Sequence, residues 1–371
     1  MTSRGVGGQL GELVAGVAVA AAIVIVPVVI GGVGRAAAEP PAADAAGGAA
    51  SALRLGYLAN VTHAPALVGL ETGLLADALG GTDLAPQAFA AGPAAIEALS
   101  AGAIDAAYLG PNPAVNSFVQ SGCASLRVIA GAAGGGAALV VRDGIAEADD
   151  LGGTTLASPQ LGNTQDVALR AWLANHDLAT SATGGGDGDV DIVPTDNART
   201  LQLFQSGELD GAWLPEPWVS RLVLEAGADV LVDEGELWPR GEYPTTVLVV
   251  RADYLVEHPH TVRALVAGHV ASVDWIADHP GELADVVNDR LAADSGAPLP
   301  DAVIERALRH VVTTTDPFAA TFPALQRAAV EAGVGRAGPG DLRGLFDLRA
   351  LNAVRAGAGL APIGAAGLGE E

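Results

Sequence analysis

Two strand-to-helix turns carry neutral hydrogen-bonding groups in a pattern that suits anion binding. These turns comprise, in order, Gly110, Pro111 and Asn112, and Gly162, Asn163 and Thr164. Free backbone N–H groups at a helix start, together with amide and hydroxyl side chains, can hold an oxyanion without any positively charged residue. Ordinary helix capping is the alternative for either turn alone. The expectation that both turns face one cleft favours ligand binding.

Four further residues could reach the same cleft. Glu216 and Trp218 belong to a Pro-Glu-Pro-Trp turn, where the carboxylate could pair with a cationic group of a ligand and the indole could stack on that group. A rim carboxylate and a core tryptophan are the alternative. Asn60 and His63 follow the first predicted strand, although a lone histidine there is more often a structural hydrogen-bonding group.

The residues give no positive sign of catalysis, of a metal or of a cofactor. All 19 basic residues are arginine, so a Schiff-base enzyme and a Gly-Lys-Ser/Thr phosphate loop are excluded. Cys123 is the only cysteine, which excludes an intrachain disulfide and a cysteine-based zinc site. His258 and His260 flank a proline without an accompanying carboxylate cluster. We therefore expect no catalytic residue and no metal ligand.

Composition narrows the classes of partner. The chain has 371 residues, is 50% hydrophobic and carries a net charge of −24. This length suffices for one large or two moderate domains with a sizeable core. The negative charge disfavours nucleic acid and anionic membrane surfaces as partners.

An internal repeat indicates two similar αβ units. Residues 93–113 and 200–218 both have the order helix, glycine turn, strand and proline-rich turn. At the offset 207 − 102 = 105, Gly102 aligns with Gly207 and Asp105 with Asp210. Such units can look alike by chance, but the shared Gly-x-x-Asp-x-Ala-aromatic-Leu run favours a true repeat.

Strands are predicted to alternate with helices along the folded part of the chain. This order predicts an α/β fold with mostly parallel sheets and helices on both faces. We expect strands at 53–58, 84–89, 104–109, 126–130, 137–141, 154–157, 190–193, 210–214, 230–232 and 245–250. We expect helices at 65–72, 93–100, 114–121, 167–175, 198–205 and 341–354, and a glycine-rich loop at 181–188. The strands 137–141 and 245–250 bracket a self-contained block and are expected to cross between two lobes.

The N-terminal region predicts export. Residues 13–30 form a nearly unbroken apolar run, and residues 36–38 offer a small-residue cleavage site. This pattern indicates a signal peptide or membrane anchor over 1–38, followed by a linker over 39–50. No cysteine lies near this region, so a lipid anchor on cysteine is excluded.

Four segments resemble a known family. They read LRLGYLANVTHAPALVGLETGLL (53–75), AFAAGPAAIEALSAGAIDAAYLGPNPAV (88–115), SPQLGNTQDVALRAWL (158–173) and SGELDGAWLPEPW (206–218). The chain resembles the periplasmic-type binding proteins of the nitrate/sulfonate/taurine class of ABC importers, particularly the aliphatic-sulfonate binders. The resemblance covers nearly all of residues 51–355. The chain departs from the pattern in lacking the lipidation cysteine usual for exported binders of bacteria with one membrane.

The resemblance implies a type II periplasmic-binding-protein fold with two Rossmann-like lobes joined by two crossover strands. Lobe 1 would comprise 51–143 and 246–371, and lobe 2 would comprise 144–245. It also implies closure of the lobes over a ligand and docking of a monomer on a membrane permease. The turns at 110–112 and 162–164 match the segments that hold the anionic head group, with Asn60 and Thr245 as weaker matches.

Several functions remain open on this fold. An aliphatic sulfonate is the first expected ligand, and taurine, nitrate, bicarbonate or a pyrimidine precursor of thiamine are alternatives. An enzyme on the same scaffold is disfavoured, because pyrimidine-forming relatives use a reactive lysine or histidine and a cysteine cluster. A membrane-anchored sensor domain is the remaining alternative.

Overall fold

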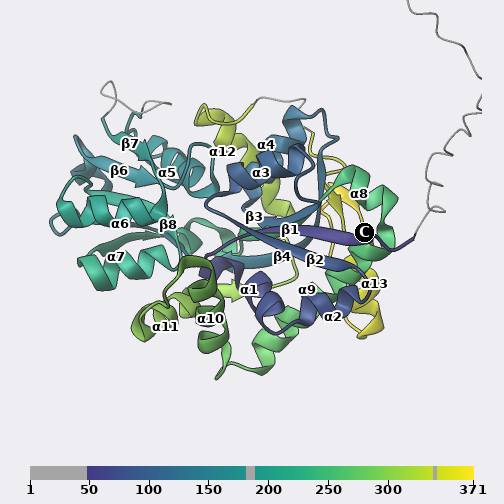
Figure 1. The fold of residues 1–371 in the computed structure, drawn as a ribbon. Coiled ribbons are helices and arrows are strands. Elements are labelled where there is room, and N and C mark those ends of the chain that lie inside the picture. The colour runs from purple at the N-terminus through teal and green to yellow at the C-terminus, as the bar shows by residue number, and fades with distance from the viewer. Residues whose placement is uncertain (1–47, 181–188, 337–340) are drawn as a thin grey trace, which may run out of the picture. The chain divides into compact units, whose positions relative to one another are not determined.

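Two separate β-sheets, each flanked by helices, organise the protein (Figure 1). The computed structural model describes residues 48–180, 189–336 and 341–371, all within one compact unit of the chain. The predicted signal or anchor segment 1–38, most of the linker and the loop 181–188 lie outside these residues. Ala50, placed by the sequence in the linker, is buried, and its N–H donates to Thr261 Oγ1 at 2.8 Å.

The first sheet has the strand order β13-β12-β4-β10-β3-β1-β2, with β11 also paired to β4. Its strands are β1 (Ala52–Leu58), β2 (Asp83–Phe89), β3 (Ala106–Leu109), β4 (Leu126–Gly135), β10 (Pro244–Arg251), β11 (Val311–Thr313), β12 (Phe346–Asp347) and β13 (Gly369–Glu370). Strand β1 is parallel to β2 and β3, whereas β10 is antiparallel to β3 and β4.

The second sheet repeats this arrangement with fewer strands. Its order is β7-β6-β8-β5-β9, formed by β5 (Ala137–Val141), β6 (Thr155–Ser158), β7 (Asp191–Pro194), β8 (Gly211–Pro215) and β9 (Asp229–Asp233). Strand β6 is parallel to β7 and β8, and β5 is antiparallel to β8 and β9. In each sheet three parallel strands are followed by one antiparallel strand, and the next strand (β4 or β9) again runs in the direction of the first three. The prediction of mostly parallel sheets is confirmed, with β5, β10 and the short β11 as the antiparallel exceptions.

The helices cover both faces of the first sheet, with α3 and α4 on one face and α1 and α9 on the other (Figure 1). The helices are α1 (Ala64–Glu71), α2 (Leu74–Leu79), α3 (Gly92–Ser100), α4 (Pro111–Gln120), α5 (Thr164–Ala174), α6 (Asn197–Ser206), α7 (Trp218–Ala226), α8 (Ala252–Glu257), α9 (Pro259–Asp278), α10 (Leu283–Ser295), α11 (Asp301–His310), α12 (Phe322–Glu331) and α13 (Arg349–Gly357). The predicted final helix began too early, because Phe346 and Asp347 pair as β12 before α13. Among the described residues, none of these helices has the length and apolar character needed to cross a bilayer.

Alternation along β5 shows how the second sheet is buried. Leu139 and Val141 pack in one apolar cluster with Leu169 and Trp172 of α5. The intervening residues of β5 pack in another cluster with α6 and α7. Successive side chains of a strand point to opposite faces, so this sheet is covered on both sides. A larger cluster surrounds the first sheet.

The internal repeat is confirmed in atomic detail. Gly102 and Gly207 both adopt left-handed conformations, with φ of 68° and 87°, which glycine adopts without a Cβ clash. Asp105 Oδ2 accepts a hydrogen bond from the N–H of Arg54 at 2.9 Å. In the second unit, Asp210 Oδ2 accepts from the N–H of Thr155 at 2.8 Å. Each aspartate thus fixes the start of the neighbouring parallel strand.

The chain passes between the sheets at two places. Strand β4 leads directly through Gly136 into β5, and the segment 234–243 leads from β9 to β10. The strand pairing groups β5 with the second sheet and β10 with the first. The division into lobes at 143/144 and 245/246 stays a prediction.

Candidate functional site

A small cavity lies where several helices begin. Its volume is about 20 Å³, roughly the space of one water molecule. It is lined by Leu58, Asn60, Thr62, His63, Ala90, Gly110, Pro159, Asn163, Gln165, Asn197, Pro215 and Thr245. Elements of both sheets contribute, because Asn60 and Gly110 follow strands of the first sheet and Pro159 and Pro215 lie at the ends of strands of the second.

Four helix N-termini converge on this cavity. His63, Gly110 and Asn163 are the N-cap residues of α1, α4 and α5, and Asn197 is the first residue of α6. The first N–H groups of a helix lack intrahelical partners, and the helix dipole places partial positive charge there. Pro65 of α1 and Pro111 and Pro113 of α4 have no N–H and supply no donor, so these two helices contribute through their dipoles and their remaining free N–H groups. The cavity therefore offers a positive potential made from backbone groups.

The side chains around the cavity are neutral. None of them is an arginine, aspartate or glutamate. The imidazole of His63 is uncharged near neutral pH, because burial lowers its pKa to about 3. An anion bound here would meet no repelling carboxylate in the lining, although the whole chain is strongly negative.

Around the cavity, some side-chain donor groups and the acceptor Asn197 Oδ1 are left without a hydrogen-bond partner among the described residues. Asn163 Oδ1 accepts from the N–H of Thr164 at 2.6 Å, so its NH₂ group is the end that can serve a ligand. Asn60 Oδ1 accepts from Trp218 Nε1 at 3.0 Å. Asn197 Oδ1 is buried and has no hydrogen-bond partner within the described residues. Buried polar atoms are normally paired, so this atom marks a position that a ligand or water completes.

Of the residues proposed from the sequence, five meet at this cavity. These are Asn60, His63, Gly110, Asn163 and Thr245. Pro111 lies buried in the first turn of α4. Asn112 and Thr164 line a different pocket, of about 380 Å³, between α5 and α12.

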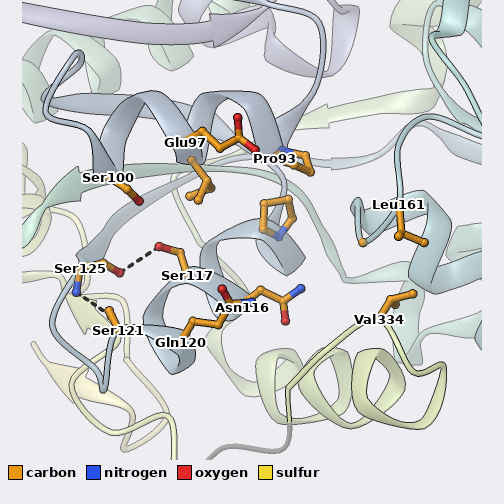
Figure 2. Close-up of a pocket in the computed structure, with 13 residues that line it drawn as sticks. Pro93, Glu97, Ser100, Asn116, Ser117, Gln120, Ser121, Ser125, Leu161 and Val334 are labelled. Carbon is orange, nitrogen blue, oxygen red and sulfur yellow. Dashed lines mark hydrogen bonds between the residues drawn. The ribbon is translucent and has the colours of Figure 1, made fainter. Parts of the chain in front are cut away.

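Gly162 lines a third pocket, of about 430 Å³, beside Leu161 and across from α3 and α4. Figure 2 shows Asn116, Ser117 and Gln120 of α4 on one side of this pocket, with Leu161 on another. Ser117 Oγ donates to Ser125 Oγ at 3.0 Å. Gly162 thus lies apart from the cavity at the helix N-termini, although its neighbour Asn163 lines that cavity.

Glu216 and Trp218 make contacts within the protein. Glu216 Oε1 pairs with Arg306 at 3.1 Å, and its Oε2 accepts from the N–H of Ser220 at 3.0 Å. Burial raises the pKa of Glu216, while Ser220 and Arg306 lower it. The charge expected to meet a cationic ligand is already balanced by Arg306, and the indole of Trp218 bonds to Asn60.

Sequence reasoning missed three polar residues of the cavity: Thr62, Gln165 and Asn197. Thr62 and Gln165 are chain neighbours of residues that were proposed. Asn197 begins α6 directly after β7, so it follows the same strand-to-helix rule that selected Asn163. Applying that rule to every such turn would have found it. Within the described ranges, no group of three or more His, Cys, Asp or Glu residues could hold a metal ion.

Comparisons with known proteins agree with one another. A family model, the NMT1-like family, matches residues 46–289. The taurine-binding periplasmic protein of Escherichia coli K12 is 29% identical over 215 residues, which cover 57% of this chain and 63% of that protein. A bicarbonate-binding protein of Synechococcus is 28% identical over 34% of this chain and 27% of its own length. The matches thus span less than two thirds of these relatives.

A solved structure shares the fold. The alkanesulfonate-binding protein of Xanthomonas axonopodis bound to MOPS has a TM-score of 0.64 with this chain. The match covers 78% of this chain and 96% of that one, at 22% sequence identity.

Proposed function

Because the chain belongs to the NMT1-like family, we propose that it is the solute-binding protein of an ABC importer and captures a small oxyanion outside the cytoplasm. The fold is the type II periplasmic-binding-protein fold, as predicted. In this proposal the protein is exported through its N-terminal segment, closes its two lobes over the ligand as a monomer, and docks on a membrane permease. No catalytic step is assigned to it.

One observation carries the proposal: four helix N-termini and neutral amide and hydroxyl groups converge on one cavity. A helix N-terminus is suited to an anion because its N–H groups and its dipole both favour negative charge. Such donors are fixed by the fold and lose little conformational entropy on binding. Residues from both sheets line the cavity, so a ligand there would hold the two lobes together.

We propose an aliphatic sulfonate as the first candidate ligand. A taurine-binding relative and an alkanesulfonate-binding structural neighbour support this choice. A bicarbonate-binding relative supports a small inorganic anion as the alternative. The cavity holds about 20 Å³, so a sulfonate with an alkyl chain requires the lobes to move apart. Nitrate or bicarbonate would require a smaller movement.

Asn163→Asp tests the anion site. Aspartate caps a helix as well as asparagine does, so the fold should persist while a negative charge lines the cavity. Charges about 4 Å apart interact by about 4 kcal/mol at an effective dielectric constant of about 20. We expect the affinity for the bound anion to fall more than about tenfold, with the unfolding temperature unchanged.

Calorimetric titration of the refolded protein with methanesulfonate, butanesulfonate, taurine, nitrate and bicarbonate would provide the measurement. Asn175→Asp makes the same chemical change at the exposed C-terminal end of α5 and should leave anion affinity unaltered. Equal affinity in Asn163→Asp and the wild type would refute the site. Binding of nitrate or bicarbonate without any sulfonate would move the proposal to the inorganic anion.

A further inference from the structure

A buried carboxyl group lies at the start of the crossover segment 234–243, which leads from β9 of the second sheet to β10 of the first. Glu234 opens the turn Glu234–Leu237 and is 1% exposed, whereas Glu236 in the same turn is exposed. The Oε2 atom of Glu234 accepts a hydrogen bond from Trp213 Nε1 of β8 at 2.8 Å. One side chain thus ties the crossover segment to a central strand of the second sheet.

Negative or neutral groups face Glu234 from the elements around it. Asp233, the last residue of β9, adds a like charge. Tyr243, near the other end of the crossover segment, is buried, and burial and the charge of Glu234 both raise the pKa of its hydroxyl. The neighbouring strands β5 and β8 contain no ionisable side chain. These surroundings offer nothing that balances a negative charge.

The basic side chains of this region are engaged elsewhere. Arg240, in the turn that follows, is 77% exposed and pairs with Glu242. His176 lines a pocket together with Glu234, but it is exposed, and its Nδ1 donates to the carbonyl oxygen of Trp172 at 2.8 Å. Among the described residues, the groups that act on the charge of Glu234 include no arginine or histidine.

A carboxylate without a cationic partner is unfavourable in a protein interior. Burial raises the pKa of Glu234 from its ordinary 4.5 to about 7, with Asp233 acting in the same direction and the bond from Trp213 opposing it. The side chain therefore changes its protonation state while the protein stays folded. Once it is ionised, movement of the turn towards water is the way to solvate the charge.

We propose that Glu234 is a proton-controlled contact of the crossover segment. The protonated side chain stays buried beside Trp213, and the ionised side chain favours a state in which the turn Glu234–Leu237 has moved towards water. Opening of the segment between the two sheets thus increases as the pH rises. This device needs no bound ligand, and only its effect on anion capture rests on the proposed function.

Hydrogen exchange of the full chain without ligand tests the proposal. Glu234→Gln keeps the shape of the side chain and an acceptor for Trp213 but is neutral at every pH. The ratio of exchange rates of residues 235–243, wild type over variant at the same pH, cancels the intrinsic effect of pH on exchange. We expect this ratio to rise about tenfold to thirtyfold from pH 5.5 to 8.5, because the open turn restores the ordinary pKa of 4.5.

Glu236→Gln is the matched control, since it makes the same chemical change at the exposed position of the same turn. The ratio of wild type to this control should be the same at both pH values. A ratio for Glu234→Gln that does not change with pH would overturn the proposal.

Carbon-13 NMR of the glutamate carboxyl groups in the wild-type chain gives a second readout that does not depend on folding of a variant. We expect one glutamate signal to titrate near pH 7. Titration of every glutamate below pH 6 would overturn the proposal. Both measurements omit the anion, so their failure would leave the anion site as proposed, and failure of anion binding would leave these outcomes unchanged.

Discussion

A buried histidine of α9 shows how a single residue fixes the first sheet and its surroundings. His269 of α9 is fully buried, and its Nε2 donates to the carbonyl oxygen of Gly131 at 2.7 Å. A carbonyl oxygen only accepts, so Nε2 carries the proton and Nδ1 accepts from Tyr108 OH at 3.0 Å. The side chain thereby joins α9 to both β3 and β4. Burial lowers the pKa of His269 to about 4, so the imidazole is neutral in the folded protein.

His269→Gln tests whether His269 is neutral in the folded protein. The unfolded chain binds a proton at His269 below pH 6.5, whereas the folded protein does not until about pH 4. The folded state therefore loses stability as the pH falls through this window, by about 1.4 kcal/mol per pH unit for this group. Urea denaturation between pH 7.5 and 4.5 should show that the free energy of unfolding of the variant depends less steeply on pH, by that amount. His260→Gln, at an exposed position of α9, should leave the slope unaltered; parallel curves for His269→Gln would contradict the assignment.

The turns that line the cavity could be identified from the sequence, but the direction of each side chain within them could not. Asn163 lines the cavity at the helix N-termini, while its neighbours Gly162 and Thr164 line two other pockets. Adjacent residues at a helix start point in different directions. Residue types therefore indicate which turn lies at the cavity, but not which of its residues lines the cavity. Glu216 was expected to meet a ligand. Its actual partner, Arg306, lies 90 positions away in the sequence, so the pairing could not be seen locally. No local pattern indicates such a pairing.

Elements with a strong local signal were predicted well. The strand Ala137–Val141 and the helix Asn197–Ser206 agree with expectation because apolar spacing and glycine turns define them locally. The strands β11, β12 and β13 were missed, since each has two or three residues and exists only through pairing across the sheet. The antiparallel entry of β10 also depends on pairing between distant segments.

Strand β4 leads to a prediction at the element scale. A Cβ added at Gly131 would lie 2.1 Å from the carbonyl oxygen of Asp316, a backbone atom that cannot rotate away. Gly131→Ala should lower the free energy of unfolding by about 2–3 kcal/mol, because the strand or the neighbouring segment must shift. At Gly81, nothing lies within 4 Å of an added Cβ, so Gly81→Ala is a matched control. The free energy of unfolding of both variants would be measured by denaturant titration. Similar values would show that β4 tolerates the added Cβ.

At the scale of the whole molecule, the two sheets are joined by a few polar contacts beside the cavity. Glu216 follows β8 of the second sheet, and Arg306 belongs to α11, which leads into β11 of the first. The bond between Trp218 and Asn60 also runs from α7, which packs on the second sheet, to a residue that follows β1. These contacts connect the two sheets at the place where a ligand is proposed to bind.

A double-mutant cycle on Glu216 and Arg306 measures this connection. Arg306→Gln leaves a buried carboxylate without its ionic partner, so we expect it to lower the free energy of unfolding by about 3 kcal/mol. Glu216→Gln should cost less, because Arg306 is partly exposed to water. The double variant should be more stable than the sum of the single effects predicts, as for residues in contact. Additive effects would mean that the pair contributes nothing to joining the sheets.

The lone thiol of Cys123 lies in the turn just beyond α4, partly exposed, with φ of 71°. Helix α4 has 10 residues, so this turn is about 15 Å along the axis from the N-terminus that faces the cavity. A maleimide dye would attach at this one position, since the chain has no other thiol. The dye would lie away from the proposed anion site, in the turn after a helix that contacts α5 of the second sheet. The native chain can thus be converted into a fluorescent reporter of the proposed movement between the sheets without introducing any cysteine.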